Sequence, residues 1–258
     1  MSLMNKKKLK KLYKRNRAFF SSIKFYILFN FLKDKNISNI NLFEKSIYSQ
    51  NGEDGIIEYI FYKIKTTNKF YVEFGVEDGA ESNTRYLRLR KDWKGLLMDG
   101  KNKNKQINLR REFITAENIE KLFKKYNVPK NIDLLSIDID FNDYYVWKAI
   151  KKYNPRLVII EYNSSISPPE SKVVKYNSKR TWDGTNYFGA SLLALKKLGE
   201  SKGYSLICCD NTGTNAFFLK RNLFKYFQAR DYLKIFKKPN YGKNNKGHKK
   251  SKEKMIEI

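Results

Sequence analysis

Short apolar runs that end at glycine or acidic residues recur along the middle of this chain. The first, Phe70 to Phe74, is followed by a glycine-spaced turn, and Ser82 to Thr84 supply cap-type residues before a helix-like segment at Arg85 to Leu89. The pattern predicts further strands over 96–100, 113–116, 132–140, 156–163, 204–209 and 216–219, with helices over 119–126, from 146 and over 190–198. Strands that alternate with helices and are apolar along their length predict an α/β fold with a buried, mostly parallel sheet.

The turn after the first strand is the clearest candidate ligand site. Gly75 and Gly79 stand four apart, and Glu73, Glu77 and Asp78 lie beside or between them. A dinucleotide pyrophosphate needs the spacing G-x-G-x-x-G and would be repelled by these acids. The turn therefore suits a cationic or hydroxyl-rich ligand, with Glu73 accepting a hydrogen bond from an ammonium group.

This stretch, Glu-Phe-Gly-Val-Glu-Asp-Gly at 73–79, resembles motif I of the class I S-adenosylmethionine-dependent methyltransferases, with Glu77 in the middle glycine position. Upstream, Ser-Gln-Asn-Gly-Glu-Asp at 49–54 resembles the lead-in of FkbM-like methyltransferases, a group linked mainly to O-methylation of sugars and natural products. The resemblance covers roughly 49–221. It implies a Rossmann-like class I methyltransferase fold: a seven-stranded, mostly parallel sheet with a terminal antiparallel hairpin and helices on both faces.

The second strand ends in Asp99, roughly 20 to 25 residues after the first loop, where nucleotide-binding α/β folds place a carboxylate on ribose hydroxyls. We therefore expect Asp99 to bind the ribose. The resemblance implies that Ala116 and Glu117, after the third strand, lie next to the adenine. The expected S-adenosylmethionine-binding residues are Glu73, Gly75, Glu77, Gly79, Asn83, Asp99, Ala116, Glu117 and Asp138.

The fourth and fifth strands both carry oxygen ligands at their carboxyl ends. Asp138 and Asp140 are two residues apart, as are Glu161 and Asn163, so each pair would share one face of an extended strand. Together these four side chains suit a divalent cation such as Mg²⁺. The Asp-x-Asp pattern is also similar to that of metal-dependent O-methyltransferases. Alternatively Asp138, Asp140 or Glu161 acts as a carboxylate base, or hydrogen-bonds to substrate hydroxyls, without a metal.

The segment Arg180 to Gly189 is dense in aromatic rings and hydrogen-bonding groups. Flat rings beside hydroxyl partners suit a sugar or another polyol, and a packed aromatic lid is the alternative interpretation. With the FkbM-like resemblance, this favours a sugar, glycan or glycan precursor as the acceptor.

The chain carries 53 Lys and Arg against 26 Asp and Glu, a net charge of +27. Such a charge attracts nucleic acid, anionic membranes or acidic glycans, although the abundance of Lys, Asn and Ile is also typical of an AT-rich genome. His248 is the only histidine, which excludes His-based triads and His-rich metal sites. Cys208 and Cys209 are adjacent in a predicted strand, so a disulfide framework is absent and a reducing, cytoplasmic location is expected.

Both ends of the chain differ in composition from the middle. We expect a basic and apolar helical extension over 1–48, a methyltransferase domain over 49–236 and a basic disordered tail over 237–258. The apolar part of the extension, 18–32, is shorter than the roughly 20 residues that span a bilayer. It is either a helix docked on the core or an interfacial helix at the inner membrane face, supported by the polybasic run before it.

Two rival functions remain from the sequence. An RNA or DNA methyltransferase would explain the positive charge and the many aromatic residues, but no Asn-Pro-Pro-Tyr type loop follows the fourth strand. A non-enzymatic, membrane-associated module on a methyltransferase fold would explain Glu77. The sequence does not indicate the oligomeric state.

Overall fold

The computed structural model describes residues 23, 25–35 and 37–258, which fall into two compact units, Met1–Ile37 and Ser38–Ile258. In the first unit, residues 25–32 are helical. The expected basic run and the start of the expected helix lie outside the described residues. Within the part of the chain that the structure describes, the helices are too short or too polar to cross a membrane.

The second unit is built on a seven-stranded sheet with the order β3-β2-β1-β4-β5-β8-β7. β1, β2, β3, β4 and β5 run parallel, and β8 pairs antiparallel with both β5 and β7. The strands are β1 (Phe70–Phe74), β2 (Lys94–Asp99), β3 (Leu109–Arg111), β4 (Asn131–Ile137), β5 (Asn154–Glu161), β7 (Tyr204–Cys209) and β8 (Asn215–Lys220). The predicted Rossmann-like class I methyltransferase fold is therefore confirmed.

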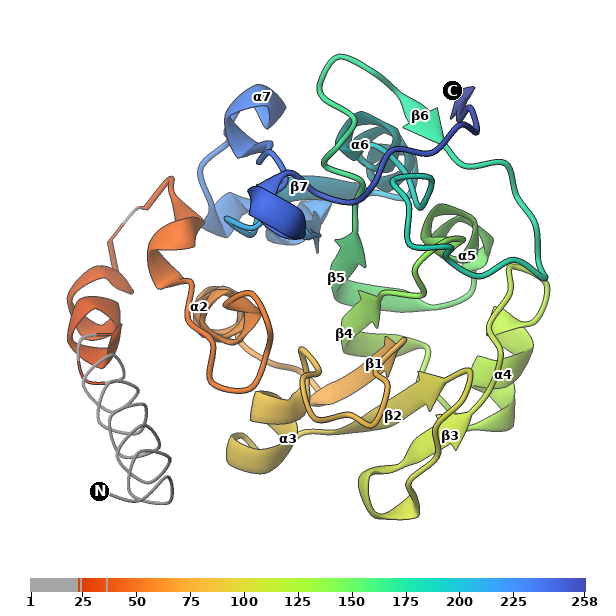
Figure 1. The fold of residues 1–258 in the computed structure, drawn as a ribbon. Coiled ribbons are helices and arrows are strands. Elements are labelled where there is room, and N and C mark those ends of the chain that lie inside the picture. The colour runs from red at the N-terminus through yellow and green to blue at the C-terminus, as the bar shows by residue number, and fades with distance from the viewer. Residues whose placement is uncertain (1–22, 24, 36) are drawn as a thin grey trace, which may run out of the picture. The chain divides into compact units, whose positions relative to one another are not determined.

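Helices cover both faces of this sheet (Figure 1). One face packs against α4, α5 and α6, and Figure 1 shows α2 and α3 on the other side. The helices are α2 (Glu53–Ile64), α3 (Arg85–Arg90), α4 (Ile119–Lys125), α5 (Asp143–Ala149), α6 (Leu192–Ser201) and α7 (Tyr232–Ile235), with short 3-10 helices η1 (Ile40–Phe43), η2 (Lys105–Ile107), η3 (Arg221–Tyr226) and η4 (Lys243–Asn245). Because both faces are covered, the central strands are apolar without alternation.

The third strand lies earlier than the sequence predicts. The structure pairs Leu109–Arg111 with β2, whereas 113–116 is not a strand. As an edge strand, β3 has a neighbour on one side only, and Leu109 is its one fully buried side chain. Its remaining residues are arginines, so the segment lacked the apolar run by which the other strands were recognised.

The domain boundaries also differ from the expected ones. The second unit begins at Ser38, because Phe43 of η1 is buried and stacks on Tyr59 of α2 with ring centroids 3.7 Å apart. At the other end, the segment 237–258, here called the C-terminal segment, packs on this unit instead of forming the expected disordered tail. Its strand β9 (Ile256–Glu257) pairs with β6 (Lys172–Val173), and Glu253 forms an ion pair with Arg180.

Candidate active site

The turn after β1, residues 75–79, here called the motif I loop, has left-handed backbone at every second residue. Its φ angles are +77° at Gly75, +49° at Glu77 and +80° at Gly79. Glycine adopts this conformation without strain, whereas a residue with a Cβ atom does so at a cost. Glu77 therefore keeps the backbone geometry that the middle glycine of the motif would have, and its side chain is exposed.

Glu73 organises the chain that follows the motif I loop. One carboxylate oxygen accepts a hydrogen bond from the Asn83 amide (2.7 Å), and the other accepts from the amide and hydroxyl of Thr84 (3.0 and 2.6 Å). Asn83 in turn donates from its side chain to Ser136 on β4. Burial raises the pKa of Glu73 to about 7. Its carboxylate thus holds the start of α3, and contact of Glu73 or Asn83 with a cofactor stays a prediction.

Asp99 closes the motif I loop from the end of β2. Its Oδ1 accepts from the amides of Lys101 and Asn102, both at 2.8 Å, and from the Asn102 side chain. Its Oδ2 accepts from the Glu77 amide at 3.0 Å. Oδ1 thus accepts three hydrogen bonds and Oδ2 accepts one, so Oδ2 is the oxygen with room for a further donor, such as a ribose hydroxyl.

The expected adenine neighbours lie in the loop before α4 and are tied to a distant segment. The Ala116 amide donates to the Tyr176 hydroxyl (3.3 Å), which itself donates to Glu117 (2.6 Å). Tyr176 was not predicted as a site residue. It belongs to the irregular loop after β5, whose sequence has no period that would place it here.

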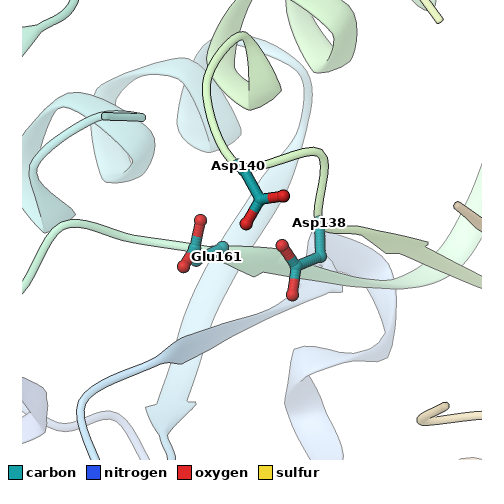
Figure 2. Close-up of side chains that lie close together, drawn as sticks. All are labelled: Asp138, Asp140 and Glu161. Carbon is teal, nitrogen blue, oxygen red and sulfur yellow. The ribbon is translucent and has the colours of Figure 1, made fainter. Parts of the chain in front are cut away.

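Three carboxylates meet where β4 and β5 end: Asp138, Asp140 and Glu161, here called the acid cluster. Each offers one oxygen, and these oxygens all lie within 4.8 Å of one another. Figure 2 shows Asp138 and Asp140 on the loop after β4 and Glu161 on the neighbouring strand. The sequence predicted that the two aspartates would share a strand face. They instead follow the end of β4, and a left-handed turn at Asp140, with a φ of +65°, brings them together.

The position of the acid cluster follows from the sheet order. β1 and β4 lie side by side at the centre of the sheet, and the chain connections run outward from them in opposite directions. Open α/β sheets bind ligands outside the carboxyl ends of the strands at such a switch point. The motif I loop lies on the β1 side of this switch point, and the acid cluster lies on the β4 side.

Another acid of β4 shows what a structural carboxylate looks like in this protein. Asp133, near the amino end of the strand, is fully buried and accepts hydrogen bonds from the amides of Thr67, Asn68 and Lys69. It also accepts from the Thr67 hydroxyl and forms an ion pair with Arg156 at 2.7 Å. By contrast, no ion pair among the described residues includes an acid-cluster carboxylate, and Oε2 of Glu161 is buried without a hydrogen-bond donor.

The carboxylates of the acid cluster are close together and destabilise one another's ionised forms. Burial, and then the charges of Asp140 and Asp143, raise the pKa of Asp138 well above its usual range. Burial and the charge of Asp138 do the same for the pKa of Glu161. Behind the cluster, Asp143 is buried with one oxygen unpartnered, and burial raises its pKa to about 7. Crowded carboxylates of this kind either bind protons or bind a cation.

The Asn163 side chain holds a neighbouring segment of the chain. It is fully buried, and its side-chain amide donates to the carbonyls of Asn186 and Phe188 at 2.8 and 3.0 Å. Its carbonyl oxygen accepts from the Ser165 amide. β5 ends at Glu161, so Asn163 lies beyond the strand on which the two-residue spacing was expected to place both side chains on one face. Asn163 anchors the 180–189 segment, and its role as a metal ligand stays a prediction.

The lead-in before α2 buttresses this edge of the sheet. Asp54 accepts from three successive amides, those of Ile47, Tyr48 and Ser49, at 2.6 to 2.9 Å. Glu53 is buried and accepts from the Asn215 side chain on β8 at 2.8 Å. The two acids of the Ser-Gln-Asn-Gly-Glu-Asp stretch thus fix a turn and tie it to the sheet.

The structure has one pocket next to this site and another at a distance from it. One of about 210 Å³ borders the motif I loop between Gly79, Arg88 and Ile107. Another of about 220 Å³ lies at the amino end of β5, lined by Trp147, Lys202 and neighbouring residues, away from the acid cluster. We place the chemistry at the acid cluster because three carboxylates converge there and none of them forms an ion pair with a described residue.

No protein-family model and no curated protein sequence matches the chain. Similar solved structures include the pyocyanin biosynthetic protein PhzM (11% identity, TM-score 0.35, 64% of this chain and 54% of PhzM). They also include the small RNA methyltransferase HEN1 (13% identity, TM-score 0.36, 64% of this chain and 24% of HEN1). A third is NcsB1, an O-methyltransferase from neocarzinostatin biosynthesis, in complex with S-adenosyl-L-homocysteine and 1,4-dihydroxy-2-naphthoic acid. It shows 12% identity and a TM-score of 0.31, over 65% of this chain and 56% of NcsB1. The matched part spans about half of PhzM and NcsB1 and a quarter of HEN1.

Proposed function

We propose that this chain is an FkbM-like, S-adenosylmethionine-dependent O-methyltransferase that acts on a hydroxyl of a sugar, glycan or glycan precursor. The observation that carries the proposal is the acid cluster: three converging carboxylates that form no ion pair with a described residue, at the switch point of a methyltransferase-type sheet. They face the position where the motif I loop would present a cofactor. An acceptor hydroxyl bound there would have both a base and a methyl donor beside it.

The cofactor would lie along the motif I loop. Oδ2 of Asp99 would accept a hydrogen bond from a ribose hydroxyl, and Ala116 and Glu117 would border the adenine. The glycines of the motif I loop would let its backbone approach the cofactor closely. When bound, S-adenosylmethionine supplies the methyl group as a sulfonium, whose C–S bond breaks as the new O–C bond forms. A negative acid cluster nearby favours that positive charge.

The acid cluster would orient the acceptor and take its proton. A base works best when its pKa is close to the working pH, and the pKa values of Asp138 and Glu161 are both raised from the usual acidic range. The proton of the acceptor hydroxyl passes to one of these carboxylates as the oxygen is methylated.

The donor set of the acid cluster also fits a divalent cation. Three carboxylate oxygens within 4.8 Å are hard ligands of the kind that Mg²⁺ prefers, and the buried, unpartnered oxygen of Glu161 lacks a donor that would compete. Asp138, Asp140 and Glu161 would hold the ion. A bound Mg²⁺ would lower the pKa of a coordinated acceptor hydroxyl.

Calorimetric titration with S-adenosylhomocysteine, with and without Mg²⁺, tests the proposal directly. We expect micromolar binding, with Asp99→Ala weakening it at least tenfold through the loss of a hydrogen bond to a charged group. Binding that depends on Mg²⁺ would assign the ion to the acid cluster. If neither heat nor a thermal shift is observed, the chain is a non-enzymatic module, and lipid binding through the N-terminal basic run becomes the next test.

A nucleic-acid methyltransferase is the second candidate, favoured by the net charge of +27. It predicts oligonucleotide binding whose affinity falls steeply with salt, because each neutralised phosphate releases counterions. The acid cluster disfavours it, since a phosphate backbone would be repelled at the reaction centre. Gel-shift titrations at about 50 and about 200 mM salt distinguish the two candidates.

A further inference from the structure

Four rings form a cluster where the 180–189 segment meets the C-terminal segment. His248 lies at the middle, with ring centroids 4.5 Å from Trp182, 5.6 Å from Phe188 and 5.1 Å from Tyr241. We call these four residues the aromatic cluster. Phe188 is buried, whereas the other three are half-buried, so the cluster presents aromatic surface to solvent.

Tyr241 joins the aromatic cluster to the segment that follows Glu161. Its hydroxyl lies 3.3 Å from the Ser164 hydroxyl, three residues after Glu161. Burial, and then the negative charges of Glu161 and Asp210, raise the pKa of Tyr241, so its hydroxyl keeps its proton. Asn163, between Glu161 and Ser164 in the chain, also holds the carbonyl of Phe188.

The C-terminal segment is held against the 180–189 segment by several bonds. The Asn186 amide donates to the Lys249 carbonyl, and the Ser251 amide donates to the Asn186 side chain, both at 2.8 Å. Arg180 pairs with Glu253 further along. Trp182 is fixed by its indole N–H, which donates to the Thr185 carbonyl at 2.7 Å. These contacts fix the positions of the rings before a ligand binds, which lowers the entropic cost of binding.

We propose that the aromatic cluster is the acceptor subsite and binds the C–H face of a pyranose ring, with the Tyr241 hydroxyl holding one sugar hydroxyl beside Glu161. The inference rests on the proposed O-methyltransferase function and names where its acceptor binds. A pyranose has an apolar face and a polar rim, so it matches a partly exposed ring with a fixed hydroxyl next to it.

The ring geometry favours a sugar over a nucleobase. The interplanar angles of His248 with Trp182, Phe188 and Tyr241 are 65°, 79° and 47°. A nucleobase is best held by parallel stacking on flat rings, and these two edge-to-face contacts and one tilted contact leave no parallel pair to enclose one. The saturated ring of a sugar needs only one exposed aromatic face.

Tryptophan fluorescence offers a probe that does not depend on activity. The chain has three tryptophans, of which Trp93 and Trp147 are buried and Trp182 is half-buried in the aromatic cluster. The full chain, saturated with S-adenosylhomocysteine, is titrated with methyl α-mannopyranoside, methyl α-galactopyranoside and methyl β-glucopyranoside. We expect a saturable fluorescence change with at least one glycoside, and no saturable change in Trp182→Phe.

Tyr241→Phe tests the hydroxyl while keeping the ring. Loss of one hydrogen bond should weaken glycoside binding about tenfold, whereas the matched control Tyr226→Phe, a surface tyrosine outside the cluster, should leave it unchanged. Thermal melting confirms that each variant is folded.

The outcomes separate the subsite from the proposed function. If S-adenosylhomocysteine binds but no glycoside changes the fluorescence, or Tyr241→Phe binds as tightly as the wild type, the subsite is wrong. A saturable response to oligouridine alone would also overturn it, in favour of a stacking site for bases. If glycosides bind and S-adenosylhomocysteine does not, the subsite stands and the methyltransferase function fails.

Discussion

The backbone carbonyl of Asp138 occupies the space that a side chain at Gly75 would need. A Cβ atom built on Gly75 would lie 1.3 Å from the Asp138 oxygen, far inside van der Waals contact. The motif I loop on β1 and the acid cluster after β4 are therefore in direct backbone contact. Any shift of the loop must move the start of the acid cluster, so the cofactor side and the acceptor side of the site are mechanically coupled.

We expect Gly75→Ala to disrupt this contact. The clash with backbone cannot be relieved by a side-chain rotation, so the change should cost at least about 3 kcal/mol of stability or prevent folding. The matched control is Gly203→Ala, which has a similar φ of +81° and open space around the added Cβ. It should cost only about 1 kcal/mol, from the left-handed backbone alone. Equal losses in urea denaturation would show that the contact with Asp138 is unimportant.

Glu77→Gly should be tolerated and modestly stabilising. Glu77 has a φ of +49° and an exposed side chain, so glycine removes strain of about 1 kcal/mol, partly offset by the greater entropy of the unfolded chain. The amide that donates to Asp99 is retained. We expect S-adenosylhomocysteine affinity within about threefold of the wild type, since no main-chain contact changes. A large loss of affinity would mean that the Glu77 carboxylate itself contacts the ligand.

The apoprotein should lose stability as the pH rises. Glu73, Asp143 and Asp210 are buried, and their pKa values are each raised to about 7 from the usual acidic range. In the folded state these groups prefer the protonated form, so their contribution is present below about pH 4 and is lost as the pH rises through about 7. Each can contribute on the order of 3 kcal/mol.

Asp143→Asn isolates one of these three groups. Asparagine cannot ionise, and its carbonyl can still accept from the Ile139 amide, as Asp143 does at 2.8 Å. The variant should be more stable than the wild type at about pH 8 and show a smaller difference between about pH 5 and 8, by urea denaturation in a chelating buffer. A wild-type protein that is more stable at about pH 8 than at about pH 5 would contradict the assignment.

Asp140→Asn should weaken cation binding without disturbing the backbone. Asparagine tolerates the left-handed conformation that Asp140 adopts, with its φ of +65°. Mn²⁺ affinity, measured by electron paramagnetic resonance, should fall at least about tenfold because one charged ligand is removed. The control is Asp78→Asn, an exposed acid of the motif I loop outside the cluster. Similar Mn²⁺ affinity in both variants would place the ion elsewhere.

Asp133→Asn should destabilise the fold and leave the site intact. It removes the charge partner of Arg156 and weakens the hydrogen bonds from the 67–69 turn, and breaking a buried pair costs about 3–5 kcal/mol. Asp133 lies at the amino end of β4, opposite the ligand edge. S-adenosylhomocysteine affinity in calorimetry should therefore match the wild type once the variant is folded, and a parallel loss of affinity would argue against this separation.

The sequence by itself determined the central sheet and the motif I loop. β1, β2, β4, β5 and the final hairpin are buried on both faces, and burial of this kind requires the long apolar runs that the sequence displays. The glycine spacing likewise predicts a turn, because left-handed backbone favours glycine. These features depend on neighbouring residues, so local patterns are enough to find them.

Only the tertiary structure decided how the site is completed. Local sequence patterns did not indicate the left-handed turn at Asp140, the hydrogen bond of Asn163 to Phe188 or the pairing of β3 with β2. The C-terminal segment is the clearest case, because its composition predicts disorder. Its order comes from contacts such as Arg180 with Glu253 and Tyr241 with Ser164, which join residues more than 70 positions apart. Contacts of that range leave no periodic pattern in the sequence, so only the tertiary structure shows that Tyr241 lies against Ser164, close in the chain to Glu161.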